Sequence, residues 1–155
     1  TRLCLEELEK SPLRGRILAD IGCGSGILSL MALSHGAQKV FAVDTDMLAI
    51  RATKINLSLN EFPETSLSVS LGSIEELCTD LDFVKVDLVL CNILLAVIKT
   101  LLPEFNKLLK PQGKAFLTGV LVDQVDDLVV SINALGFRVL QILEKNGWAL
   151  IEISS

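Results

Sequence analysis

Two hydrophobic patterns alternate along the chain. Short runs rich in Val, Ile and Leu are typical of buried strands, whereas longer segments with an apolar residue at every third or fourth position are typical of helices. One such helical stripe runs through Leu48, Ala52, Ile55 and Leu59. Because strands and helices alternate, the pattern predicts helices packed on both faces of a mainly parallel sheet.

The two patterns divide the chain into predicted elements. Strands are expected at residues 16–20, 39–43, 67–71, 86–91, 115–119, 138–144 and 148–153. Helices are expected at residues 3–9, 26–34, 46–59, 74–78, 95–110 and 125–135. Asn146 and Gly147 are typical of a two-residue hairpin, which makes the last two strands antiparallel to each other. The expected fold is therefore α/β, with a doubly wound, mostly parallel seven-stranded sheet that ends in an antiparallel hairpin.

The composition fits one folded domain. The chain has 155 residues, of which 50% are hydrophobic, and its formal net charge is -5. This supplies enough apolar surface for a single core, but not the basic surface of a dedicated nucleic-acid-binding protein, so no direct nucleic-acid partner is expected. There is no signal-peptide pattern and no apolar run of about 18 residues. No membrane contact is therefore expected, and the predicted location is the cytoplasm, or the stroma or matrix of an organelle.

The cysteines and the histidine offer no metal site. Cys4, Cys23, Cys78 and Cys91 are widely spaced and form no C-x-x-C pair. This pattern is typical of buried thiols in a reducing compartment, and not of a disulfide framework or a zinc site. The single histidine, His35, argues against a His-rich metal centre, so no metal is expected.

The strongest local signal is the segment DIGCGSG at residues 20–26, which follows a predicted strand and opens a predicted helix. Glycine adopts positive φ angles at low cost and lets a ligand approach the main chain where a Cβ would obstruct it. The segment therefore predicts a ligand-binding loop, with a ligand-free connector as the alternative. The predicted cofactor-binding residues of this loop are Asp20, Gly22, Cys23, Gly24 and Gly26.

The spacing of the glycines discriminates between cofactors. A dinucleotide fingerprint has the form G-x-G-x-x-G, whereas here the third glycine comes one place early, at Gly26, and Ile27 occupies the fingerprint position. A loop that does not have to cradle a pyrophosphate suits S-adenosylmethionine. The spacing favours this cofactor over NAD.

Asp44 ends the second predicted strand, 24 residues after Asp20. A carboxylate at this position can accept hydrogen bonds from both hydroxyls of a ribose, and it would repel the 2′-phosphate of NADP. The alternative is that Asp44 is a helix N-cap, although Thr45 or Asp46 can serve that role equally well. We predict that Asp44 binds the ribose and that Thr45 belongs to the same site.

Polar residues also follow the third and fourth predicted strands. Gly72 and Ser73 lie where an adenine ring would rest, with a helix cap formed by Ser73 as the alternative. Asn92 comes at the carboxyl end of the run 86–91, where its amide can hold the methionine end of the cofactor or orient an incoming amine. The alternative interpretation is that Asn92 forms an Asx turn between the strand and the following loop. Asn92 is the candidate catalytic residue.

Several other residues are given structural interpretations. His35 is expected to end a helix before Gly36, Cys23 needs no thiol chemistry, and Trp148 is expected to pack on the last hairpin. The acidic residues that are expected to be solvated charges are Asp80, Asp82, Asp126 and Asp127.

With these residues identified, the chain resembles the PrmA family, the methyltransferases of large-subunit ribosomal protein eleven. The glycine loop alone marks only the class I methyltransferase superfamily, whereas the combination of motifs is more specific. The matching stretches are TRLCLE at 1–6, the glycine loop, VDTD at 43–46, ATKIN at 52–56, DLVLCNIL at 87–94, LKPQG at 109–113, TGVL at 118–121 and GW at 147–148.

The resemblance implies N-methylation of lysine and N-terminal amines of a protein, with S-adenosylmethionine as the donor and S-adenosylhomocysteine as the product. It implies that Asn92 lines the cofactor site and that Thr1 belongs to a loop that closes over the cofactor. Residues 1–155 then correspond to the catalytic domain, and the substrate-recognition domain that precedes it in the family is absent from this sequence. The first residue is Thr1 and not Met, so the chain is expected to begin inside a longer protein, or to have been processed or cut.

Three alternatives to a protein N-methyltransferase remain open at this point. One is a small-molecule N-methyltransferase, since fold and cofactor do not name the acceptor. Another is a non-catalytic module that binds S-adenosylmethionine, and the third is a fragment of an NAD-dependent oxidoreductase. The oligomeric state does not follow from the sequence.

Overall fold

The computed structural model describes residues 1–81 and 84–155; Asp82, predicted to be a solvated charge, lies outside them. The strands are β1 (Ile17–Ile21), β2 (Lys39–Asp44), β3 (Leu67–Leu71), β4 (Val86–Asn92), β5 (Leu109–Leu121), β6 (Arg138–Lys145) and β7 (Trp148–Ser154). The α-helices are α1 (Arg2–Leu8), α2 (Ile27–Ser34), α3 (Met47–Leu59), α4 (Ile74–Leu81), α5 (Leu95–Leu101), α6 (Phe105–Leu108) and α7 (Val125–Ala134). Short 3-10 turns are η1 (Glu64–Ser66), η2 (Leu102–Glu104) and η3 (Val122–Gln124).

The strands form a single sheet of order β3-β2-β1-β4-β5-β7-β6. Strands β1 to β5 run parallel to one another, and β7 is antiparallel to both β5 and β6. The order reverses at β1, with β2 and β3 on one side and β4 and β5 on the other. Ligands of such sheets bind in the crevice that this reversal leaves at the carboxyl ends of the strands. The predicted fold class is confirmed.

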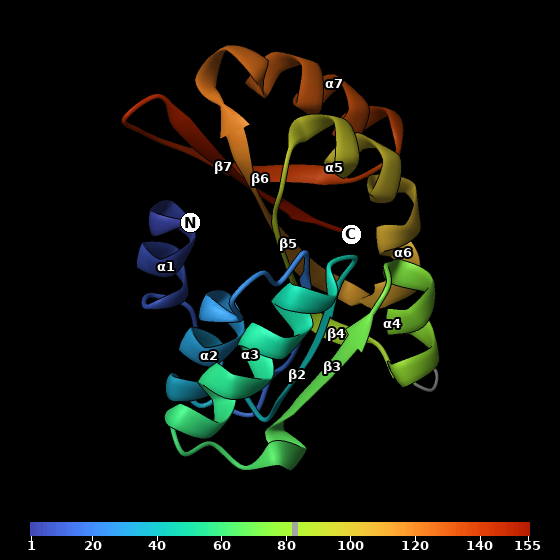
Figure 1. Cartoon of the computed structure of the whole chain (residues 1–155). Coiled ribbons are helices and arrows are strands. Elements are labelled where there is room, and N and C mark those ends of the chain that lie inside the picture. The colour runs from blue at the N-terminus through green and yellow to red at the C-terminus, as the bar shows by residue number, and fades with distance from the viewer. Residues whose placement is uncertain (82–83) are drawn as a thin grey trace.

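Helices cover both faces of the sheet (Figure 1). On one face α1, α2 and α3 bury Leu8, Leu28 and Leu57 against the strands. On the other face α4, α5, α6 and α7 close a second core that includes Leu77 and Leu128. Each fully buried side chain of this size contributes about 1.5–3 kcal/mol to folding, so the two cores hold the sheet as a rigid platform for the loops at its edge.

The single helix predicted over residues 95–110 is wrong. The segment is divided into α5, the 3-10 turn η2 and α6, with Pro103 inside the 3-10 turn. Proline has no N–H to continue an α-helix, which accounts for the break. The following strand β5 is longer than predicted, because Leu109 pairs with Val86 before the register shifts at Lys114.

The predicted hairpin is confirmed between β6 and β7. Asn146 and Gly147 have φ angles of 52° and 80°, and Lys145 pairs with Trp148 across the turn. Two successive residues with positive φ are what a two-residue turn of this hand requires. The hairpin places Trp148 near the end of the sheet where the parallel strands finish.

The cysteines also behave as predicted. All four are free, and Cys4, Cys23 and Cys91 are buried. No group of three or more His, Cys, Asp or Glu within residues 1–81 and 84–155 is arranged to hold a metal ion. In the same part of the chain, every helix is too short or too polar to span a membrane.

Candidate active site

The loops at the carboxyl ends of the first three strands border a pocket, here called pocket A. It has a volume of about 380 Å³ and is lined by Gly22 after β1, by Asp44 and Thr45 after β2, and by Gly72 and Ser73 after β3. Five residues that the sequence assigns to cofactor binding thus meet in one place. The opposite wall is apolar and includes Leu94, Val97 and Leu101.

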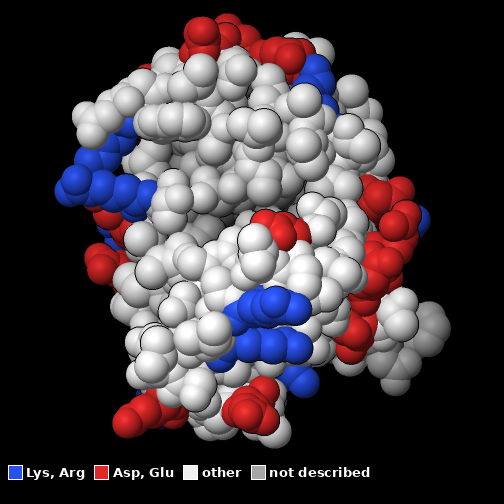
Figure 2. Space-filling view, viewed as in Figure 1, with Lys and Arg blue, Asp and Glu red and all other residues white. Residues whose placement is uncertain are grey.

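A second pocket, pocket B, adjoins pocket A on the side of β4 and β5. Its volume is about 520 Å³, and it shares Ile93 and Leu94 with pocket A. Thr1 and Asn92 line it together with Trp148 of the terminal hairpin. Figure 2 shows this face of the molecule, with a recess bordered on one side by basic side chains.

Gly22 lies where the sheet order reverses and needs to be glycine for two reasons. Its φ angle is +72°, and a Cβ built on it would lie 2.4 Å from Cγ2 of Ile93. The backbone of the glycine loop therefore contacts the segment that follows β4 directly. Because Ile93 lines both pockets, this contact lies where pocket A adjoins pocket B.

The rest of the glycine loop is held by α3. Oγ1 of Thr53 donates to the Gly24 carbonyl at 3.0 Å, and Nδ2 of Asn56 donates to the Ser25 carbonyl at 2.9 Å. A Cβ on Gly26 would lie 2.7 Å from Cγ2 of Thr53, so only glycine permits this close approach of loop and helix. Thr53 and Asn56 belong to the ATKIN stretch, and sequence reasoning gave neither of them a role in the site.

Four of the five predicted residues of the loop line neither pocket, and Asp20 is one of them. Cys23, Gly24 and Gly26 line neither pocket A nor pocket B, so they shape the loop from behind. Burial raises the pKa of Cys23 to about 12, and its thiol stays neutral. This agrees with the interpretation that Cys23 carries no thiol chemistry.

Asp44 joins two loops through its carboxylate. Oδ2 accepts a hydrogen bond from Gly24 N at 2.9 Å, and Oδ1 accepts one from Asp46 N at 2.9 Å. The N-cap of α3 is Asp46, which accepts from Leu48 N at 2.8 Å, so the N-cap alternative for Asp44 is wrong. Each carboxylate oxygen of Asp44 keeps a second lone pair, and the residue lines pocket A.

The turn after β3 is fixed by an acidic residue of α4. Oε2 of Glu76 accepts a hydrogen bond from Ser73 N at 2.8 Å, and a Cβ on Gly72 would lie 2.3 Å from the same oxygen. This bond lowers the pKa of Glu76 below its ordinary value. Glu76 thus fixes the backbone N–H of Ser73, which is a different donor from those that a cap formed by the Ser73 hydroxyl would satisfy.

Asp20 lies beneath the loop and is almost completely buried. Its Oδ2 accepts a hydrogen bond from Oγ of Ser29 at 2.5 Å, whereas Oδ1 has no partner among the described residues. Burial raises the pKa of Asp20 to about 6; the Ser29 bond opposes this rise, and the nearby charge of Asp44 adds to it. A buried acceptor without a partner is costly, which is typical of a group kept for a ligand.

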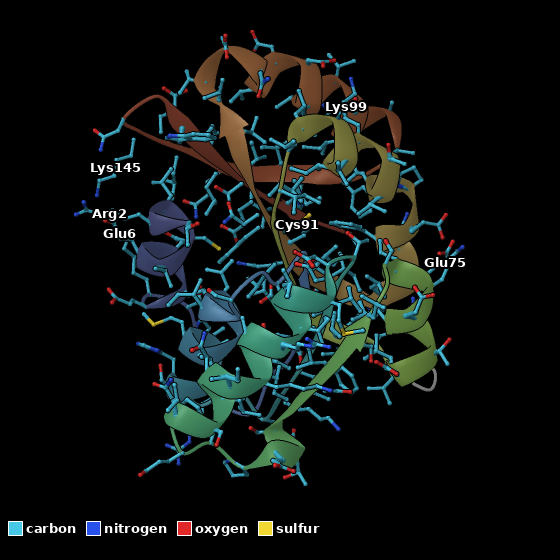
Figure 3. All side chains as sticks on the ribbon, in the orientation of Figure 1. Arg2, Glu6, Glu75, Cys91, Lys99 and Lys145 are labelled. Atoms are coloured by element: carbon cyan, nitrogen blue, oxygen red, sulfur yellow. The ribbon has the colours of Figure 1, made fainter. Side chains whose placement is uncertain are left out.

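Asn92 and Thr1 form the polar part of pocket B. Asn92 is the last residue of β4, next to Cys91, which Figure 3 labels near the centre of the molecule. Its Nδ2 donates to Oγ1 of Thr1 at 2.8 Å, and the Thr1 nitrogen lies 3.5 Å from its Oδ1. The Asx-turn alternative is therefore wrong, because the amide bonds to a residue distant in sequence.

Ionic and polar contacts tie α1 to the terminal hairpin beside pocket B. Glu6 accepts hydrogen bonds from Nζ of Lys145 at 2.6 and 2.8 Å and from Nε of Arg2 at 3.0 Å. Figure 3 shows these three side chains together. The bond from Lys145, followed by that from Arg2, lowers the pKa of Glu6. Nε2 of Gln141 adds a bond to Glu7 at 3.0 Å, so the helix that carries Thr1 is anchored to the sheet.

Sequence reasoning missed part of the lining. Trp148 is 49% exposed and lines pocket B, whereas sequence reasoning gave it no place in a pocket. Gly119 of β5 also lines pocket B, and a Cβ on it would lie 2.5 Å from the Ile93 carbonyl. Gly119 belongs to the TGVL stretch, and the close approach explains why that stretch contains glycine.

The sheet order, the antiparallel β7 and the glycine loop after β1 together define the class I methyltransferase fold. Within that class, the family described as "Ribosomal protein L11 methyltransferase (PrmA)" matches the chain over residues 1–155. The chain belongs to this family, which confirms the resemblance seen in the sequence. This family assignment argues against the alternative of an NAD-dependent oxidoreductase.

Similar proteins agree with this assignment. A ribosomal protein L11 methyltransferase of Parasynechococcus marenigrum is 51% identical over 153 residues, covering 99% of this chain and 53% of that protein. One of Prochlorococcus marinus is 46% identical, covering 99% of this chain and 50% of that protein. The crystal structure of a ribosomal protein L11 methylase from Lactobacillus delbrueckii has a TM-score of 0.87 at 25% identity and covers 99% of this chain and 76% of that one. The chain spans about half the length of the relatives it matches.

Proposed function

We propose that this chain is the catalytic domain of an S-adenosylmethionine-dependent N-methyltransferase that modifies amines of a ribosomal protein. The observation that carries the proposal is that pockets A and B adjoin each other, with Ile93 and Leu94 lining both. A carboxylate, Asp44, lies at one end and an amide, Asn92, at the other. An elongated donor and an amine acceptor can therefore meet between them.

The residues of pocket A fit an adenosine group. Asp44 keeps lone pairs for the two ribose hydroxyls, since Gly24 and Asp46 use only one lone pair on each oxygen. The apolar side chains of Leu94, Val97 and Leu101 suit an adenine ring. Thr45, Gly72 and Ser73 would border the nucleoside, and Gly22 would let it lie against the main chain.

The methionine end would extend toward pocket B. Asp20 supplies a buried carboxylate oxygen without a partner below the loop, and Thr1 and Asn92 supply a hydroxyl and an amide at the pocket wall. S-adenosylmethionine would supply a methyl group that is bonded to a positively charged sulfur. The acceptor amine would attack the methyl carbon in line with the carbon–sulfur bond, and S-adenosylhomocysteine would leave. The predicted role of Asn92 is to accept a hydrogen bond from the amine through Oδ1 and so align its lone pair.

Alignment and exclusion of water carry most of the rate enhancement in this mechanism. The acceptor amine must lose a proton before it attacks, and no side chain of pocket B is a carboxylate or an imidazole. Water is therefore the proposed proton acceptor. The Asn92–Thr1 bond fixes the amide, so that Asn92 is the candidate catalytic residue and Thr1 positions it.

The acceptor is proposed from the relatives, whose names specify ribosomal protein L11. A small-molecule amine and a non-catalytic cofactor-binding module are the alternatives. The assignment of residues 1–155 to the catalytic domain alone, without the substrate-recognition domain of the family, is part of the proposal. The cytoplasmic location and the absence of a nucleic-acid partner stay predictions.

A transfer assay tests the proposal. The chain is incubated with methyl-labelled S-adenosylmethionine and, separately, with the large-subunit ribosomal protein eleven or with free lysine, and the products are identified by mass spectrometry. Labelled amines on the ribosomal protein are expected. Transfer to free lysine alone would favour the small-molecule alternative, and cofactor binding without any transfer would favour the non-catalytic one.

A further inference from the structure

A third pocket opens on the far side of Trp148. This pocket, pocket C, has a volume of about 520 Å³ and lies between α5 and α7. It shares Leu94, Gly119 and Trp148 with pocket B. Pockets B and C therefore adjoin each other at these three residues, and Leu94, which is 72% exposed, borders pockets A, B and C.

The end of pocket C beside Trp148, the near end, differs in chemistry from the opposite, far end. Leu94, Leu95 and Leu121 make the end beside Trp148 apolar. At the far end Nζ of Lys99 donates to Oδ1 of Asp127 at 2.6 Å and bridges α5 to α7. Oδ2 of Asp127 has no hydrogen-bond partner among the described residues, and the side chain is 60% exposed.

The charge around the far end is negative. Within the pocket lining, the carboxylate of Asp127 is paired with the single cation, Lys99. Asp123 in η3 and Asp126 in the first turn of α7 are exposed neighbours of this lining and make the local charge negative. Figure 2 shows acidic side chains along the edge of the molecule that α7 forms, and Figure 3 labels Lys99 beneath them. An apolar trough that ends in excess negative charge complements a side chain with an aliphatic stem and a cationic end.

We propose that pocket C binds a lysine or arginine side chain that flanks the acceptor amine in the polypeptide substrate. Its aliphatic stem lies along Leu94 and Trp148, and its cation reaches Oδ2 of Asp127. The acceptor amine itself enters pocket B, and the polypeptide crosses above Gly119. This proposal rests on the proposed function, because it requires a polypeptide acceptor in the adjoining pocket B.

The test uses Trp148 as an internal probe, since it is the single tryptophan of the chain. Its fluorescence is followed as short peptides are added in the presence of S-adenosylhomocysteine. Each peptide carries a central lysine and, within three residues of it on either side, a second lysine or an uncharged norleucine. The lysine-flanked peptide is expected to bind about threefold to fivefold more tightly at the best spacing, and 0.5 M salt is expected to remove this preference.

Two variants with opposite expected effects distinguish a specific contact with Asp127 from a general attraction between the acidic surface and a cationic peptide. Asp127→Asn removes the carboxylate and is expected to abolish the preference for the flanking cation. Lys99→Met removes the competing cation and is expected to increase the preference about twofold or more. Asp126→Asn changes the charge equally at the next residue, which is exposed but outside the pocket lining, and is expected to leave most of the preference intact.

The outcomes are distinguishable. Equal binding of the two peptides by the unmodified chain, or equal loss of preference in Asp126→Asn and Asp127→Asn, would overturn the proposal for pocket C. Binding of S-adenosylhomocysteine in those experiments would leave the proposed function standing. Failure to bind S-adenosylhomocysteine would count against the proposed function as well.

Discussion

Nδ2 of Asn92 donates a hydrogen bond to Oγ1 of Thr1 at 2.8 Å, across 91 positions of sequence. The bond joins the end of β4 to the residue that precedes α1, and both residues line pocket B. A side chain at the carboxyl end of a strand is thus oriented by the N-cap residue of α1. This arrangement makes the position of Asn92 dependent on how α1 docks.

Replacing Asn92 with Ala is expected to reduce turnover about tenfold to a hundredfold, because a small misalignment of reacting groups costs that much. The affinity for S-adenosylhomocysteine is expected to change less. Methyl-transfer kinetics and calorimetry measure the two quantities separately. Thr1→Ala is expected to lower turnover in the same direction and Thr1→Ser to restore it, whereas unchanged turnover in Asn92→Ala with full cofactor affinity would rule out the proposed role.

Asp44 and Asp46 offer a matched pair of substitutions. Asp44→Asn removes the charge that would bind the ribose, and the affinity for S-adenosylhomocysteine is expected to fall about tenfold to a hundredfold. Asp46→Asn keeps an equally good N-cap on α3, and its affinity is expected to match that of the unmodified chain. Titration calorimetry on the two variants would contradict the ribose role of Asp44 if they bound equally well.

Thr53 is buried and holds the glycine loop through the Gly24 carbonyl. Thr53→Val keeps the shape and removes the donor, which is expected to lower the free energy of unfolding by about 1 kcal/mol and to weaken cofactor binding. Thr53→Ser retains the hydroxyl and is expected to preserve the affinity. Urea denaturation and calorimetry provide the two measurements, and equal cofactor affinity in Thr53→Val and Thr53→Ser would argue against a role for this bond in the site.

The buried carboxyl of Asp20 predicts a pH dependence of stability. Burial raises its pKa from 3.8 to about 6, so the folded state binds more protons than the unfolded state between these values. The free energy of unfolding is therefore expected to fall, by up to about 3 kcal/mol from this group, as the pH rises from about 4 to about 6, and then to level off.

Two variants isolate the contribution of Asp20. In Asp20→Asn the free energy of unfolding is expected not to show this decrease, because the amide does not titrate. Ser29→Ala removes the hydrogen bond that opposes the rise in the pKa of Asp20. The decrease in the free energy of unfolding is therefore expected to extend to higher pH in this variant. Urea denaturation at a series of pH values measures the effect, and identical profiles for Asp20→Asn and the unmodified chain would show that Asp20 is ionised at no cost.

Much of pocket A follows from local sequence. Gly22, Asp44, Gly72 and Ser73 each come within two residues of the end of a predicted strand, and parallel strands bring their carboxyl ends to one edge. Their convergence needs only the order of strands and helices, which the periodicity of apolar residues supplies. The break at Pro103 is the local feature that the prediction of a continuous helix overlooked.

Pocket B and the support of the glycine loop depend on packing between distant segments. Thr53 reaches Gly24 because α3 docks on the loop, and Thr1 reaches Asn92 because α1 lies against the terminal hairpin. The periodicity of α3 predicts that the helix exists, but not which of its polar residues turns toward the loop. Trp148 is a similar case, since the hairpin turn places it at the start of β7 but does not predict that it is half exposed and lines pocket B.

The most direct test of the central claim is a calorimetric titration of the 155-residue chain with S-adenosylhomocysteine and, separately, with NAD. Saturable one-to-one binding of S-adenosylhomocysteine, weakened in Asp44→Asn and absent for NAD, is expected if pockets A and B form the cofactor site. Binding of NAD, or no binding of S-adenosylhomocysteine by a chain shown to be folded, would contradict that claim.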